Sequence, residues 1–208
     1  MFPRQTCAYF EDFLGYNYNS NLWFITATGT GGVGTTQTGT DAYGGQMRIT
    51  CTNGGAGTAN IRTVASEWWT AYTPTFECLF RIQQTTDIEA RMGFYIDGSN
   101  WVALEADDDN SGNFIFVANR ATVRTEVDTG IALTTGFRHL QIKLNGFTGD
   151  ALCILDEDAA NVFTIPHANI PAGDAYQLFG ETIADATGAG TSRLFWDYVG
   201  AYQQRVQG

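Results

Sequence analysis

Three acidic side chains at alternate positions are the strongest catalytic candidates in this sequence. They are Glu105, Asp107 and Asp109, in the run WVALEADDD. Alternate residues of a β-strand face the same side of a sheet, so these carboxyl groups would share one face. Two carboxyl groups about 5 to 5.5 Å apart, one ionised and one protonated, can carry out retaining glycoside hydrolysis. Asn110-Ser111-Gly112 follows at once and predicts a turn, so the trio runs off the end of its strand.

The same acidic turn is a candidate calcium site. Asp107, Asp109 and Ser111, followed by Gly112, are spaced like the start of a calcium-binding loop, and Ca²⁺ needs several oxygen ligands. The bidentate glutamate expected further along is missing, because Ala118 stands there. A solvated hairpin turn is the alternative that we favour, so we predict no cofactor.

Trp68, Trp69 and Tyr72 are candidate contact residues. Aromatic side chains of this kind can stack on sugar rings or on the aromatic groups of a partner. Successive strand residues point to opposite faces, so at most one of the two tryptophans can lie in the core. Two interpretations stay open: carbohydrate binding, or one buried tryptophan and one at a subunit contact.

The histidines and cysteines form no recognisable catalytic or metal-binding motif. His139 and His167 lack a neighbouring Ser or Cys that would mark a nucleophile. The four cysteines lie far apart without a C-x-x-C spacing, which argues against a zinc site; they are Cys7, Cys51, Cys78 and Cys153. Three of them fall in strand-like runs, and we predict reduced cysteines in the core rather than disulfides.

The composition predicts one all-β domain. Of the 208 residues, 44% are hydrophobic and only 16% are charged, so there is enough apolar surface for a core. Abundant aromatic residues and 24 glycines are typical of pleated strands joined by tight turns. We predict a two-sheet antiparallel β-sandwich, because about a dozen strand-like segments follow one another with hardly a helix between them. The clearest hairpin joins 91–96 to 101–106 through Asp97-Gly98.

The net charge of −11 excludes several partners. A nucleic-acid backbone or an anionic membrane would repel this surface, whereas a basic protein or a neutral sugar would not. The chain also has no apolar run as long as a membrane span, and Met1 to Tyr9 does not have the pattern of a signal peptide.

The chain divides into an N-terminal arm, residues 1–10, and a single domain, residues 11–208. The Gly/Thr-rich stretch at 28–45 carries few core-forming side chains. It is either a long exposed loop or an arm that orders against a neighbouring subunit.

Four segments together resemble the concanavalin A-like lectin/glucanase superfamily, of the laminin-G-like type. They are FEDFLGY with Trp23 soon after, GFYIDGSNWVALEADDDNSGNFIF, FRHLQIKLNG and LFWDYVGAY. The resemblance implies a jelly-roll sandwich. Laminarinase-like hydrolases of this superfamily carry nucleophile and acid in an E-x-D-x-E pattern. Here Asp109 replaces the last glutamate and the charged Asp108 replaces a usually apolar residue, so we predict that the protein is not an enzyme.

Within that superfamily the chain is similar in style to virion proteins of tailed bacteriophages. This implies a structural protein of the virion, assembled in the host cytoplasm: a capsid decoration (cement) protein, a head fibre or a tail-associated module. Its expected partners are capsid or other virion proteins and further copies of itself, for example in a trimer. The alternatives are a lectin-like module that binds host-surface glycans and, third, a glucan hydrolase using Glu105 and Asp109.

Overall fold

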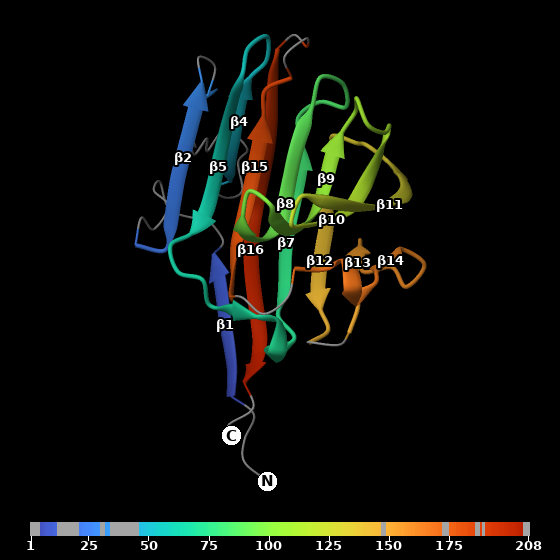
Figure 1. Cartoon of the computed structure of the whole chain (residues 1–208). Helices are drawn as coiled ribbons and strands as arrows, with labels where there is room; N and C mark the ends of the chain where they lie inside the picture. The colour runs from blue at the N-terminus through green and yellow to red at the C-terminus, as the bar shows by residue number, and fades with distance from the viewer. Residues whose placement is uncertain are drawn as a thin grey trace.

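The computed structural model of the chain is a sandwich of two antiparallel β-sheets (Figure 1). It describes residues 5–11, 21–29, 32–33, 46–146, 149–171, 175–185, 188 and 190–205. Sheet A contains, in spatial order, β14 (Val162–Ile165), β13 (Ala151–Leu155), β12 (Arg138–Leu144), β7 (Thr75–Ile82), β16 (Thr191–Arg205), β4 (Met47–Thr52) and β3 (Gly32–Val33), and β1 (Gln5–Glu11) also pairs with β16. Sheet B contains β11 (Val123–Ala132), β10 (Asn113–Arg120), β9 (Asn100–Asp107), β8 (Glu89–Asp97), β15 (Ala175–Ile183), β5 (Gly57–Thr63) and β2 (Trp23–Gly29), and the short β6 (Trp68–Trp69) pairs with β15. Two 3₁₀ turns complete the fold, η1 (Thr70–Tyr72) and η2 (His167–Asn169). The predicted all-β antiparallel sandwich is confirmed.

Alternation of apolar and polar residues fixes which face of each strand meets the other sheet. In β7, sequence TFECLFRI, the side chains of Phe76, Cys78, Phe80 and Ile82 are fully buried while those between them are partly exposed. Aromatic rings join the two sheets, with the Trp23 and Trp196 centroids 6.0 Å apart. Each such buried side chain contributes roughly 1.5 to 3 kcal/mol, so the sandwich is stabilised mainly by this interior layer.

The two ends of the chain meet in sheet A. β1 runs antiparallel to the last part of β16, from Gln5 opposite Arg205 to Glu11 opposite Val199. Figure 1 shows β1 and β16 side by side at the lower end of the molecule, beside β7. Residues 5–10 of the predicted N-terminal arm are therefore part of a sheet, and residues 1–4 lie outside the described residues.

The predicted hairpin between β8 and β9 is present, but its turn is made differently from the expectation. Gly98 does not have a positive φ angle. The Asp97 carboxylate instead accepts hydrogen bonds from the Ser99 backbone N–H, at 2.7 Å, and from the Asn100 amide. The side chain of Asp97 thus closes the turn, and the backbone needs no left-handed glycine.

Other sequence predictions fall partly outside the described residues. The Gly/Thr-rich stretch begins in β2 and includes β3, while residues 30–31 and 34–45 are not described. Cys51, Cys78 and Cys153 are free and buried, as predicted, and Cys7 lies in β1 with its side chain outside the described part. No helix among the described residues is long and apolar enough to cross a membrane.

Candidate functional site

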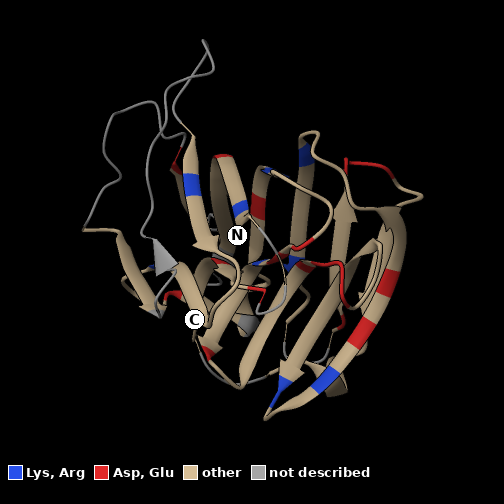
Figure 2. Ribbon diagram, turned by 90° about the horizontal axis from the view of Figure 1, so that it is seen from above, with Lys and Arg blue, Asp and Glu red and all other residues tan. Residues whose placement is uncertain are grey.

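The candidate catalytic strand β9 presents its polar side chains on the outer face of sheet B, the face turned away from sheet A. Val102, Leu104 and Ala106 point into the core, so Glu105 and Asp107 point outward. The register places Glu105 opposite Arg91 on β8 and Asp107 opposite Glu89. Figure 2 shows acidic and basic residues interspersed over the two sheets, including both signs on the curved edge strand β11.

Glu105 is buried and is held by an arginine. Its side chain is 1% exposed, and both carboxylate oxygens accept hydrogen bonds from Arg124 of β11. The Arg124 Nη1 to Glu105 Oε2 distance is 3.1 Å. Such a bidentate pair fixes the carboxylate and neutralises its charge.

Two arginines cover Trp101, which lies four residues before Glu105 on the same face of β9. The guanidinium carbons of Arg91 and Arg124 lie 4.8 Å and 5.9 Å from the Trp101 ring centroid. Arg91 also pairs with Glu181 of β15, with Nε and Oε2 2.5 Å apart. Trp101 is consequently 3% exposed and offers no stacking surface to a ligand.

Two carboxyl groups, those of Glu89 on β8 and Asp107 on β9, lie opposite each other on the same outer face, next to the Arg91–Glu105 pair. Burial and the neighbouring charge of Asp107 raise the pKa of Glu89 to about 7, with Arg91 acting in the opposite direction. Burial and the charge of Glu105 also raise the pKa of Asp107. Glu89 could not be identified as a candidate from the sequence, because its position opposite Asp107 depends on the pairing of two strands.

The acidic turn uses its side chains to shape the backbone. β9 ends at Asp107, whose Oδ1 accepts from the Asn110 backbone N–H at 3.3 Å, while Asp109 is exposed. Asp108 accepts hydrogen bonds from the backbone N–H groups of Asp87 and Ile88. The prediction that the acidic run Glu105, Asp107 and Asp109 extends beyond the end of its strand is thus confirmed.

Two of the three proposed calcium ligands, Asp107 and Ser111, form side-chain hydrogen bonds within this part of the protein. Ser111 Oγ lies 3.4 Å from Asp128 Oδ2, on the neighbouring strand β11. In the described ranges, no three His, Cys, Asp or Glu side chains are arranged to hold a metal ion.

The two adjacent tryptophans point in opposite directions, as predicted. Trp68 is 3% exposed and Trp69 is 44% exposed, while Tyr72 is half-buried in η1. Gln203 of β16 accepts from the Trp69 backbone N–H at 3.1 Å and donates to the Glu67 carbonyl at 2.8 Å. These two bonds hold β6 in place, so Trp69 projects from a fixed backbone.

Trp69 belongs to an exposed apolar corner on the outer face of sheet B, which we define as Leu22, Phe24, Val64 and Trp69. Their exposed fractions are between 39% and 54%. Trp69 lies opposite Ala175 of β15, and Leu22 and Val64 extend β2 and β5 by one residue each. The members of this corner come from three separate segments of the chain, a combination that the sequence did not predict.

Arg62 extends the apolar corner toward the middle of the sheet. It lies opposite Phe24, and its guanidinium carbon is 5.8 Å from the Phe24 ring centroid and 4.7 Å from that of Tyr95. Tyr95 in turn contacts the Phe179 ring, with centroids 5.4 Å apart. Rings and a planar cation thus form a continuous platform.

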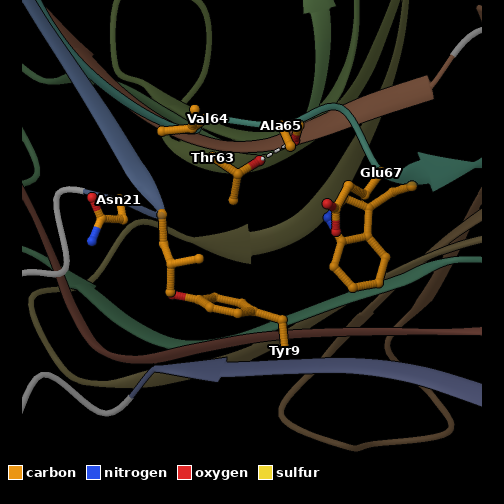
Figure 3. A pocket seen from close by; sticks show the side chains of 8 residues that line it. Tyr9, Asn21, Thr63, Val64, Ala65 and Glu67 are labelled. Atoms are coloured by element: carbon orange, nitrogen blue, oxygen red, sulfur yellow. Dashed lines mark hydrogen bonds between the residues drawn. The ribbon is translucent and has the colours of Figure 1, made fainter.

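A small pocket opens beside the apolar corner (Figure 3). Its volume is about 190 Å³, and Leu22 and Val64 belong to its wall. Figure 3 shows Tyr9 across the pocket from Val64 and Ala65, with a hydrogen bond from Thr63 to the Ala65 carbonyl. Because Tyr9 comes from β1 of sheet A and Thr63 from β5 of sheet B, residues of both sheets contribute to the pocket.

The two antiparallel sheets form a jelly-roll sandwich, a fold that this chain shares with solved structures of glycosyl hydrolases of family 16. No model of a known protein family and no curated protein matches the sequence. Solved structures do match, and they show the fold alone, because the sequence identities are low.

Three of these structures illustrate the range of proteins with this fold. A β-1,3-glucanase from Mycobacterium marinum is 14% identical, with a TM-score of 0.67 over 93% of this chain and 97% of the other. An immunostimulatory antigen and pseudo β-1,3-glucanase of Mycobacterium tuberculosis is 10% identical, with a TM-score of 0.67 over 95% and 98%. A protein of unknown function from Shewanella oneidensis MR-1 is 15% identical, with a TM-score of 0.68 over 98% and 90%.

Proposed function

We propose that the protein is a non-enzymatic binding protein. The observation that carries this proposal is the capture of Glu105 by Arg124. Retaining hydrolysis needs one carboxylate free to attack and a second one protonated beside the substrate. Glu105 has both oxygens engaged and is 1% exposed, and Asp109 lies in the turn beyond the strand. We therefore assign the carboxyl groups of the E-x-D-x-D run a structural role and no catalytic one.

An assay with β-glucans tests the absence of catalysis. We expect no release of reducing sugar from laminarin or mixed-linkage β-glucan above the buffer rate, for the wild-type protein and for Glu105→Gln. Glu89→Gln is assayed in parallel, because Glu89 is the remaining candidate acid on this face. Release by the wild type that disappears in either variant would contradict the proposal.

The contact surface that we propose is the apolar corner of sheet B, and the ligand class is a glycan. Exposed apolar patches on soluble proteins often mark binding sites. Trp69 and Phe24 offer ring faces to the apolar side of a sugar, and Arg62 can donate hydrogen bonds to its hydroxyls. The glucanase names of several structures with this fold support a glycan.

A glycan array followed by titration tests the ligand class. We expect Trp69→Ala and Phe24→Ala each to weaken binding at least tenfold. Phe137→Ala is the matched control, because Phe137 is also a large exposed side chain, 45% exposed, but stacks with Arg81 of sheet A. Failure of the wild type to bind any glycan at millimolar concentration would remove this ligand class.

The setting that we propose, from the sequence resemblance, is the virion of a tailed bacteriophage. Capsid or other virion proteins and further copies of the chain are then its partners, and a subunit contact becomes the alternative use of the apolar corner. Incubation of purified particles with the Phe24→Ala/Trp69→Ala double variant distinguishes a subunit contact from glycan binding. Loss of particle occupancy supports the subunit contact, whereas full occupancy with lost glycan binding supports the lectin-like alternative.

Truncation of residues 1–10 is a less direct test of an attachment arm. Because residues 5–10 form part of β1, the truncation would also remove a strand from sheet A. Particle binding by a truncated protein that remains folded would contradict a role for this segment.

A further inference from the structure

A notch with a glycine floor lies on the outer face of sheet A, on the opposite side of the sandwich from the apolar corner. Its volume is about 220 Å³, and β1, β16 and β7 supply its walls. Phe10 stands on one side of Gly200 and Glu77 on the other, since both are paired with Gly200. Tyr198 and Tyr202 belong to the same wall, two residues before and after Gly200 on β16.

Gly200 keeps the notch open. A Cβ atom built at this position would lie 3.2 Å from the Tyr9 carbonyl oxygen and 3.4 Å from Cδ2 of Phe10. Any larger residue would fill the floor and press on the Phe10 ring. The notch therefore depends on the absence of a side chain at the centre of four larger ones.

Glu77 presents a carboxylate held in a fixed position. Its Oε1 accepts from the Tyr198 hydroxyl at 3.2 Å and lies 3.0 Å from His139 Nε2, and its Oε2 accepts from Gln141 at 3.0 Å. Burial and the charge of Glu77 raise the pKa of Tyr198, so the Tyr198 hydroxyl keeps its proton and donates. Glu77 itself is still 28% exposed, which leaves it accessible from the notch.

The aromatic walls are well exposed to a ligand. Phe10 and Tyr202 are 65% and 41% exposed. The Phe10 and Tyr198 rings lie 5.4 Å apart and are tilted by 31°. The faces of aromatic rings attract cations within about 6 Å of their centroids.

We propose that this notch binds the positively charged end of a lysine or arginine side chain of a partner protein. Aromatic rings around one carboxylate complement an organic cation and would disfavour an anion or an uncharged apolar group. The net charge of −11 raises the local concentration of basic partners over the whole surface. This inference goes beyond the proposed function of sheet B, and either can fail without the other because the two surfaces lie on opposite sheets.

Three matched peptides test the notch: acetyl-Gly-Gly-Lys-Gly-Gly-amide and its arginine and glutamine counterparts. Nuclear magnetic resonance titration of the labelled protein is expected to show saturable shifts at Phe10, Gly200 and Tyr202 with the two basic peptides. Glu77→Gln should weaken their binding at least tenfold, and Gly200→Ala should weaken it by filling the floor. Phe10→Ala removes a wall from a 65% exposed position, so it tests the notch even where Glu77→Gln fails to fold.

Asp109→Asn is the control for net charge, since it removes one negative charge from an exposed turn outside the notch. It should leave peptide affinity within twofold of the wild type. Equal binding of the glutamine peptide, or an equal loss in Asp109→Asn and Glu77→Gln, would overturn the proposal. Absence of saturable binding by both basic peptides would overturn it as well.

Discussion

At the scale of single residues, the acidic run on the outer face of sheet B shows that a catalytic pattern in the sequence does not fix the surroundings of its carboxyl groups. Glu105 occupies the position that the E-x-D pattern assigns to a reactive carboxylate, and Arg124 engages both of its oxygens. The sequence predicted that Glu105 and Asp107 would share a face. It could not predict the arginine, because Arg124 reaches Glu105 across β10, and only the register of three strands brings them together.

Removal of Arg124 is expected to destabilise the fold strongly. Arg124→Ala leaves the carboxylate of Glu105 buried without a partner, which costs about 3 kcal/mol or more. The Glu105→Gln/Arg124→Ala double variant should recover part of that loss, because the amide carries no buried charge. Chemical denaturation of the wild type, both single variants and the double variant measures the free energies of unfolding. Additive losses in the double variant would contradict the coupling.

Glu89 makes stability depend on pH near neutrality. Its pKa is about 7 in the folded protein, against an ordinary value near 4.3 in an unfolded chain. Between these values the folded state binds more protons, so the free energy of unfolding falls as the pH rises and then levels off above pH 7. Glu89→Gln should remove this fall and stabilise the protein by roughly 1 to 2 kcal/mol at pH 8, after allowance for partial exposure. Unfolding at pH 5 and pH 8 checks it, with the exposed Glu67→Gln as control.

At the scale of elements, local patterns predicted more than pairing did. The β8–β9 hairpin followed from two apolar runs around Asp97-Gly98, and the opposite orientations of Trp68 and Trp69 followed from strand alternation. The pairing of β1 with β16 and of β6 with β15 did not follow, because residues far apart in the sequence determine them. Neither contact leaves a signal in a short window of residues.

Gly180 lies where side chains of sheet A pack against the backbone of sheet B. A Cβ atom built on it would lie 2.4 Å and 2.6 Å from ring carbons of Trp196 and 2.8 Å from Cδ1 of Ile49. Gly180→Ala should therefore destabilise the protein by about 1 to 3 kcal/mol through overpacking. Gly112→Ala is the matched control, since nothing lies within 4 Å of its added Cβ. Equal melting temperatures for both variants would show that the sheets can separate at no cost.

At the scale of the whole molecule, the chain closes on its last strand. β16 lies between β7 and β4 in sheet A and also pairs with β1, and its side chains at Leu194, Trp196 and Val199 are fully buried. Composition and alternation sufficed to predict a sandwich. The central place of the final strand could not be predicted, because antiparallel sandwiches accept many strand orders that bury the same apolar faces.

A chain that ends at Gly190 is expected not to fold, because it lacks the strand that joins the two halves of sheet A. Removal of β16 exposes the inner edges of β7 and β4 and deletes large buried side chains that include Trp196. Native pairing in sheet A must then wait until β16 has been synthesised. Near-ultraviolet circular dichroism and thermal unfolding should show no cooperative transition in the truncated chain. The control is a chain lacking only residues 206–208, which keeps β16 whole and should unfold cooperatively. A cooperative transition in both truncated chains would contradict the prediction and place the folding core in sheet B alone.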